Sequence, residues 1–205
     1  MQAVIRAWLR GPWAKPVVGA VLLAPLAYLV GAAFMNALGP NPAEALILAT
    51  GELALRSLCV ALAVTPVRVM SGWPEWARLR RMIGLIAFTY AVLHVLSYSW
   101  FDMGFDWADI ATDLGKRPFI FVGMLTFVVL LALAATSFNA AIRRLGARRW
   151  QALHRLVYAS ALLALLHFYW KRSGKHNFDD VWVYGGIIAL LLGWRLWRRL
   201  RPHKN

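Results

Sequence analysis

The feature that most constrains this chain is a series of six long apolar runs separated by short charged connections. A helix needs about 20 mostly apolar residues to cross roughly 30 Å of hydrocarbon. The runs cover residues 16–38, 45–67, 82–101, 118–138, 152–170 and 181–194. With 60% hydrophobic and 16% charged residues, the chain is too apolar for a soluble domain. We therefore predict an all-α membrane protein, with residues 1–205 forming a single domain built as a six-helix transmembrane bundle.

The net charge of +14 is explained by which connections carry the basic residues. Sixteen lie at one side of the predicted bundle: Arg6, Arg10, Lys15, Arg68, Arg78, Arg80, Arg81, Arg143, Arg144, Arg148, Arg149, Arg195, Arg198, Arg199, Arg201 and Lys204. The opposite connections carry five, with six aspartates: Lys116, Arg117, Lys171, Arg172, Lys175, Asp102, Asp106, Asp109, Asp113, Asp179 and Asp180. By the positive-inside rule, we expect both termini in the cytoplasm. Membrane orientation explains the charge, so we expect no nucleic-acid partner.

Ionisable residues inside the apolar runs are few, and such residues are costly in a bilayer and often functional. The third run contains His94, the fifth contains His154, Arg155 and His167, and the second contains Glu52 and Arg56. Cys59 is the single cysteine, which excludes an intramolecular disulfide and a cysteine-rich metal cluster. The three histidines are therefore the leading candidates for chemistry.

Depth in the membrane separates these histidines into two groups. A neutral imidazole offers one nitrogen lone pair, which is what haem iron binds in an axial ligand. His94 lies about 18 Å beyond the cytoplasmic start of its run and His167 about 22 Å, at 1.5 Å per residue. His154 lies only about 3 Å from the start of the same run as His167. We predict that His94 and His167 ligate one haem in the outer half, and that His154 lies elsewhere, on another helix face or beyond an irregular turn.

Other interpretations of these polar residues remain open. A membrane histidine can simply form a hydrogen bond between helices, and His154 is close enough to the interface to meet water. His176 and His203 are expected to be solvated. Glu52 and Arg56 are spaced as an intrahelical ion pair, which serves either packing or a site beside a cofactor propionate. A small ion or proton transporter is an alternative function, in which these groups would form a relay.

Several motifs together resemble one known family. They are TPVR at 65–68, LRRMIGL at 79–85, FTYAVLHVLSY around His94, the Thr136–Ser137 pair, and LGARRWQALHRLVY followed by LLHFYW. In this order they resemble the MsrQ family, formerly YedZ, within the ferric-reductase-like transmembrane group. The resemblance covers almost the whole chain.

This resemblance implies a function and a set of partners. Members are b-type haem electron-transfer subunits of the bacterial inner membrane. They serve a periplasmic molybdenum-containing methionine sulfoxide reductase, MsrP, which repairs oxidised proteins. The family is associated with FMN, and with electrons from the quinone pool or a cytoplasmic flavin reductase. Its three histidines fall on His94, His154 and His167, of which we expect the first and last to bind the haem iron.

This sequence departs from the di-haem oxidases of the wider group, because the third run has no second histidine. We therefore expect one haem. No glycine-rich phosphate-binding loop is visible, so the sequence does not place FMN on a motif, and Arg80 and Arg81 are candidates for its phosphate. Near these arginines and His154 we expect a flavin or quinone site. The catalytic centre is expected on the partner, for which the acidic connection at 102–113 is a candidate docking face. A ferric or quinone reductase with another acceptor remains the alternative.

Overall fold

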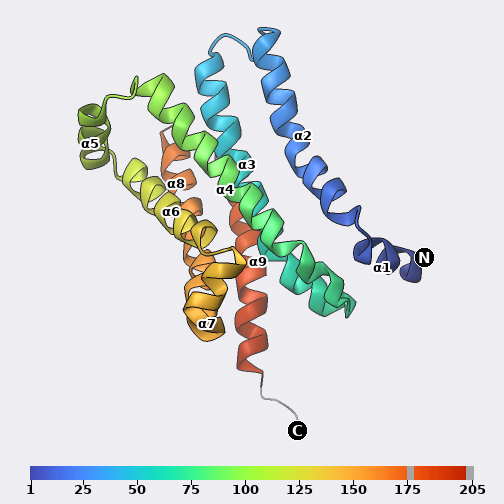
Figure 1. The fold of residues 1–205 in the computed structure, drawn as a ribbon. Coiled ribbons are helices and arrows are strands. Elements are labelled where there is room, and N and C mark those ends of the chain that lie inside the picture. Colours follow the sequence, from blue (N-terminus) through green and yellow to red (C-terminus); the bar gives the residue numbers. More distant parts are fainter. Residues whose placement is uncertain (175–177, 202–205) are drawn as a thin grey trace.

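The computed structural model describes residues 1–174 and 178–201. Within them all regular structure is helical, without strands (Figure 1). Five segments are long and apolar enough to cross a membrane: Ala14–Phe34, Pro42–Ser71, Pro74–Asp102, Pro118–Ala135 and Asn139–Ser173. This confirms an all-helical, multi-pass membrane protein. His176 and His203 lie outside the described residues.

The helices follow one another with short connections. They are α1 (Gln2–Arg10), α2 (Ala14–Phe34), α3 (Pro42–Ser71), the 3-10 turn η1 (Pro74–Arg78), α4 (Arg80–Ser97), the π-helical turn η2 (Tyr98–Asp102), α5 (Trp107–Lys116), α6 (Pro118–Ala135), α7 (Asn139–His154), α8 (Leu156–Ser173) and α9 (Asp179–Leu200). The short helices α1, α5 and α7 connect or flank the apolar ones (Figure 1).

The sixth predicted run, 181–194, lies inside α9 but is not among the five apolar segments. Asp179 and Asp180 begin this helix, and Arg195 and Arg198 follow the apolar run, so its uncharged part is shorter than the roughly 20 residues of a typical span. α9 is nevertheless part of the core, because Ile188 is 1% exposed.

Helix ends follow local sequence signals. The Asn41 side chain caps α3 by accepting a hydrogen bond from the Glu44 amide at 3.1 Å, and Pro42 occupies the first turn. α3 ends at Gly72, which has a left-handed φ of 70°. In α2, Pro25 interrupts the helical hydrogen bonds, and one turn earlier the Leu22 carbonyl accepts the buried Tyr90 hydroxyl at 2.7 Å.

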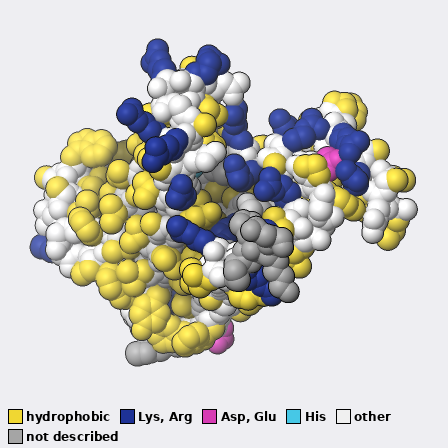
Figure 2. Space-filling model, turned by 90° about the horizontal axis from the view of Figure 1, so that it is seen from below, with side chains coloured by type: hydrophobic (Ala, Val, Ile, Leu, Met, Phe, Trp, Pro, Cys, Tyr) yellow, Lys and Arg dark blue, Asp and Glu magenta, His cyan; other side chains and the backbone are white. Residues whose placement is uncertain are grey.

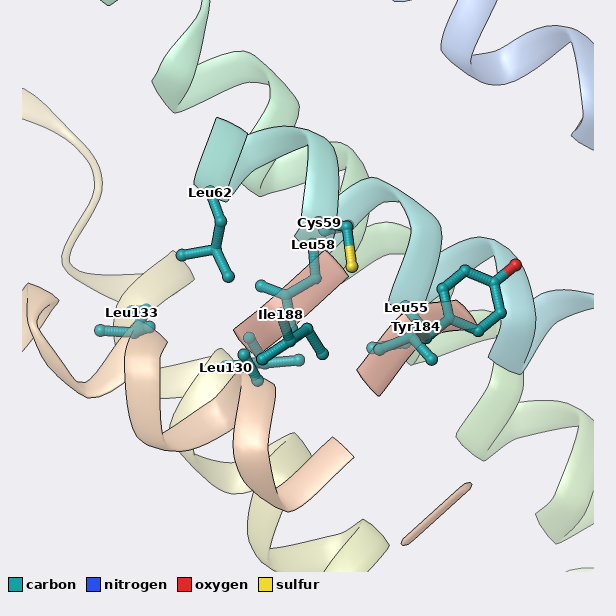
Figure 3. Packing of buried hydrophobic residues seen from close by; sticks show 11 residues of the cluster. Leu55, Leu58, Cys59, Leu62, Leu130, Leu133, Tyr184 and Ile188 are labelled. Carbon is teal, nitrogen blue, oxygen red and sulfur yellow. The ribbon is translucent and has the colours of Figure 1, made fainter. Parts of the chain in front are cut away.

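The main core lies where α3, α4, α6, α8 and α9 meet. From α3 it contains Leu55, Leu58, Cys59 and Leu62; from α4 Ala87 and Ala91; from α6 Leu130 and Leu133; from α8 Ala161; and from α9 Tyr184 and Ile188 (Figure 3). Small residues on α4 and α8 let the helices approach closely, as is common in membrane bundles. This packing fixes α4 against α3 and α8 against α6.

The fifth predicted span, 152–170, lies within the apolar segment Asn139–Ser173, which is divided into two helices. α7 ends at His154 and α8 begins at Leu156, with a tight turn at Arg155 between them. α7 is itself kinked at Gly146, where φ is 73° and ψ is 154°, a conformation that essentially only glycine adopts. His154 and His167 therefore lie on different helices, which agrees with the irregular turn expected between them.

Basic side chains gather at one end of the bundle. The end of α9 and α7 lie toward the lower part of Figure 1, and α1 lies at the lower end of α2. Viewed from below, this end presents many Lys and Arg side chains and few Asp or Glu (Figure 2). α1 is fixed here by Glu75 of η1, whose carboxylate lies 3.2 Å from Arg6 and 2.6 Å from Arg10. The basic connections predicted to share one side thus come together.

Candidate functional site

The structure brings His94 and His167 together. His94 lies on α4 and His167 on α8, and their ring centroids are 6.1 Å apart with an angle of 73° between the ring planes. The two helices are separated by 58 residues of chain, from Tyr98 to Arg155, so this proximity is a property of the fold. The depth-matched pair predicted from the sequence is therefore present.

Both imidazoles are oriented by backbone carbonyls. Nδ1 of His94 lies 2.9 Å from the carbonyl oxygen of Ile47 on α3, and Nδ1 of His167 lies 2.6 Å from that of Phe119 on α6. A carbonyl oxygen only accepts hydrogen bonds, so each Nδ1 carries the proton and each Nε2 keeps its lone pair. Metal-bound histidines are commonly fixed in this way.

The cavity around the pair is apolar with a charged rim. Its walls include Leu55, Leu58, Ala91, Phe127, Leu130 and Phe168. Arg117, Lys171 and Arg172 line it where α6 begins and α8 ends, and Asp102 and Glu52 also reach it. An apolar planar group with anionic substituents matches this distribution, because the basic side chains can pair with the anions.

His154 lies in a second, more polar cavity at the basic end. Its Nε2 is 3.2 Å from the Thr136 hydroxyl, and its ring stacks on Trp150 with centroids 4.1 Å apart. Trp150 in turn donates from Nε1 to the Thr136 carbonyl at 2.8 Å. The predicted separation of His154 from the other two histidines is thus confirmed.

This second cavity is positively charged. It is lined by Arg80, Arg81, Arg155 and Arg195, and its described lining includes no carboxylate. Arg195 donates to the carbonyls of Leu191 and Leu62, while its Nε is buried and has no partner in the structure. A buried donor without a partner is costly, and an anionic or carbonyl-bearing ligand in the cavity would satisfy it.

The predicted Glu52–Arg56 pair is present and has a third member. Arg56 donates from Nη2 to Glu52 at 2.6 Å and from Nε to the Tyr184 hydroxyl at 2.7 Å. Tyr184 on α9 donates to the same Glu52 oxygen at 3.0 Å. The i, i+4 spacing revealed the pair, but nothing in the sequence indicated that α9 would supply a tyrosine.

Known proteins similar to this chain share one description. A family model for the ferric reductase like transmembrane component matches residues 48–165. A protein of Polaromonas naphthalenivorans named protein-methionine-sulfoxide reductase heme-binding subunit MsrQ is 62% identical over 190 residues, covering 93% of this chain and 87% of that protein. This chain belongs to the MsrQ family.

More distant relatives of this MsrQ-family chain have the same name. The Bordetella pertussis protein is 47% identical over 188 residues, covering 90% of this chain and 91% of that protein. The Xanthomonas campestris protein is 43% identical over 199 residues, covering 94% of this chain and 89% of that protein. The family resemblance inferred from the motifs is confirmed. The family-model match includes His94 and His154 and ends two residues before His167.

The acidic connection of this MsrQ-family chain is only partly free to meet a partner. Asp113 is 9% exposed and accepts hydrogen bonds from the Tyr98 hydroxyl, at 2.6 Å, and from Arg117. Burial alone would raise the pKa of the Asp113 carboxyl, but these hydrogen bonds from Arg117 and Tyr98 lower it below its ordinary value. Asp106 caps α5 through the amides of Ala108 and Asp109. Three acids of the predicted docking face are exposed: Asp102, Asp106 and Asp109. The fourth, Asp113, is buried and does not contribute to that face.

Proposed function

We propose that this chain is a b-type haem electron-transfer subunit, with His94 and His167 as the axial ligands of one haem. The observation that carries this proposal is a pair of imidazoles whose ring centroids are 6.1 Å apart, each with Nδ1 bonded to a backbone carbonyl, which leaves Nε2 as the ligand atom. The haem-binding subunits named among the relatives support the same cofactor.

The ring separation fits a metal between the two imidazoles. If both Nε2 atoms bound one metal at about 2 Å, with about 1.1 Å from each Nε2 to its ring centre, the centroid separation would be roughly 6 Å. The observed 6.1 Å agrees with this value. When bound, the haem supplies one-electron redox chemistry. The chain contributes the ligands, their orientation, an apolar wall and the basic rim formed by Arg117, Lys171 and Arg172.

The proposed topology has six membrane crossings in one domain over residues 1–205, with both termini in the cytoplasm. α9 supplies the sixth crossing, because Tyr184 and Ile188 pack into the core beside α3. Its flanking charges can extend toward the two interfaces. The basic end seen in Figure 2 would then face the cytoplasm of a bacterial inner membrane.

The cavity around His154 is proposed as the electron-donor side. It lies at the basic end and combines Arg80, Arg81 and Arg195 with the stacked rings of His154 and Trp150. Arginine forks suit a phosphate or a quinone carbonyl, and aromatic rings suit a planar ligand. We propose FMN or a quinone here, supplied by a cytoplasmic flavin reductase or the quinone pool.

The acceptor is proposed to be a periplasmic molybdenum-containing reductase like MsrP, which repairs oxidised methionine in periplasmic proteins. The relatives' name, which refers to methionine sulfoxide reductase, supports this acceptor over ferric iron. The exposed acids Asp102 and Asp109, at the end opposite the basic one, are available to an outer partner.

Absorption spectra test the ligand assignment. We would purify the wild type, His94→Ala, His167→Ala and His154→Ala in detergent and record reduced-minus-oxidised spectra. We expect His94→Ala and His167→Ala to lose the low-spin haem signal, and His154→Ala to keep it. If His94→Ala and His167→Ala retain the full signal, the assignment is wrong. A pyridine haemochrome content near two haems per chain would contradict the single haem and point to a second one at His154.

The acceptor needs a separate experiment. Membranes containing the chain would be mixed with a purified MsrP-like reductase and a chemical donor, and methionine sulfoxide reduction in a test protein would be measured. We expect reduction that requires both proteins and is lost in His94→Ala. Equal activity toward ferric chelates without the partner would favour the ferric reductase alternative.

A further inference from the structure

Each of the two facing imidazoles lies directly against a helix glycine. On α3, a Cβ added to Gly51 would lie 2.9 Å from both Cε1 and Nδ1 of His94. On α6, a Cβ added to Gly123 would lie 2.8 Å from the same two atoms of His167. Non-bonded carbon atoms normally stay about 3.5–4.0 Å apart, so a methyl group fits at neither position unless the ring moves.

The two glycines occupy equivalent places. Gly51 follows Ile47 by four residues, and Gly123 follows Phe119 by four residues. Four residues are about one helical turn, so each glycine lies on the same face as the carbonyl that accepts the imidazole proton. Each ring is therefore held between an acceptor at one turn and bare backbone at the next. The pair α3–α4 and the pair α6–α8 repeat the same arrangement.

Close helix packing alone does not explain these positions. Small residues are common wherever membrane helices approach, so the other helix glycines provide a comparison. A Cβ at Gly84 of α4 or at Gly186 of α9 would meet nothing within 4 Å. At Gly19 and Gly185 the nearest atoms are 3.5 Å and 3.8 Å away, which is ordinary contact. The closest approaches are those to the two histidine rings.

We propose that Gly51 and Gly123 are positioning residues that set the place and the plane of the His94 and His167 imidazoles. This inference rests on the proposed haem function. A methyl group at either glycine would push the ring away from the helix that carries its carbonyl acceptor. This movement changes the position of Nε2, the atom proposed to bind iron.

The first test compares Gly51→Ala and Gly123→Ala with the control Gly186→Ala in purified full-length protein, since Gly186 lines neither cavity and an added Cβ there meets nothing within 4 Å. The readouts are haem per chain, midpoint potential and the low-spin electron paramagnetic resonance spectrum. We expect weaker haem retention in both variants, by roughly 10–100-fold, the range seen when the support of a metal-bound histidine is lost. Any haem retained should have a shifted spectrum and potential. Gly186→Ala should match the wild type. Wild-type values in both test variants would overturn the proposal.

A second measurement needs neither haem nor a fully stable single variant. In a His94→Ala background the ring that blocks position 51 is absent, so adding Gly51→Ala should no longer lower the melting temperature of the apoprotein, because alanine otherwise favours a helix over glycine. Gly123→Ala in the same background should still lower it, because His167 remains. If Gly51→Ala costs the same with and without the His94 ring, the proposed contact is wrong.

The two proposals fail in different ways. A wild type without a haem signal that depends on His94 and His167 contradicts the proposed function, while the melting comparison still tests the contact between glycine and ring. If the wild type has this signal and Gly51→Ala and Gly123→Ala have wild-type haem content, potential and spectrum, only the role of Gly51 and Gly123 is overturned.

Discussion

The imidazole planes of His94 and His167 are inclined at 73° to each other, close to perpendicular. This angle is set by two separate hydrogen bonds, one to Ile47 on α3 and one to Phe119 on α6. The relative orientation of the rings is therefore a consequence of how two helix pairs pack together, and under the proposed haem ligation it predicts a spectroscopic signature.

The first prediction concerns the oxidised haem protein. Nearly perpendicular axial imidazoles leave two iron d orbitals close in energy, which gives a strongly anisotropic low-spin signal with one large g value. We expect this signal from the purified protein at low temperature. A rhombic signal, typical of parallel imidazole planes, would show that the rings rotate when haem binds.

The second prediction concerns the arginine-lined cavity. We expect Arg80→Gln to weaken FMN binding by about tenfold or more, because a hydrogen bond to a charged group contributes roughly 1.5–3 kcal/mol. FMN fluorescence quenching would measure the affinity, and the haem spectrum should stay unchanged. Arg143→Gln is the control, since Arg143 belongs to the same basic end but does not line the cavity. If Arg80→Gln and Arg143→Gln lost the same amount of FMN affinity, the result would indicate only a general attraction between the basic end and the anionic FMN.

The third prediction concerns the Glu52–Arg56–Tyr184 group. Removing one partner of an ion pair leaves the other charge without its partner, which costs more than removing both. We expect Glu52→Gln to destabilise the protein more than the double change Glu52→Gln/Arg56→Gln. Because the Arg56 side chain is 57% exposed, the interaction free energy between Glu52 and Arg56 from this double-mutant cycle should be only about 1 kcal/mol.

Thermal unfolding in detergent would measure this coupling. Tyr184→Phe serves as the matched variant, because it removes only the hydroxyl group and should cost about 1 kcal/mol. A double variant as unstable as the sum of the single changes would mean that the two charges do not interact.

The fourth prediction concerns acid stability. The pKa of Asp113 is lowered in the folded protein, so its contribution is fully present above the ordinary aspartate pKa of about 3.9. That contribution is lost as the pH falls through the lower pKa of the folded state. We expect Asp113→Asn to lose about 1–3 kcal/mol at neutral pH, because Tyr98 and Arg117 keep no charged acceptor.

Melting temperatures between pH 3 and pH 7 would check this difference. The difference in melting temperature between the wild type and Asp113→Asn should become smaller toward pH 3. Asp109→Asn, at an exposed position of the same helix, should show a much smaller gap at every pH. A gap for Asp113→Asn that is independent of pH would contradict the role of its charge.

Much of this arrangement was predictable from the sequence, because hydropathy fixes where a membrane helix lies along the bilayer normal. Once the ends of the runs are set by charged residues, a rise of 1.5 Å per residue gives each histidine a depth. These depths pair His94 with His167 and leave His154 apart, and in the structure the first two rings lie together while His154 contacts Thr136.

The rest depended on how helices turn and pack around one another. The break at Arg155 follows no proline or glycine at that position, so an apolar pattern could not place it. Tyr184 joins Glu52 only because α9 packs beside α3. The carbonyls of Ile47 and Phe119 belong to the main chain, which no side-chain pattern reveals. A signal for the site was nevertheless present in two helix glycines, Gly51 and Gly123.

The two carbonyl acceptors also determine which sequence changes the site can tolerate. Since the main chain receives both imidazole protons, replacing the side chain at position 47 or 119 leaves the acceptor in place. These positions can vary during evolution without altering the proton placement on His94 or His167. Relatives with different residues there would keep the same ligand chemistry, provided that the helices keep their register.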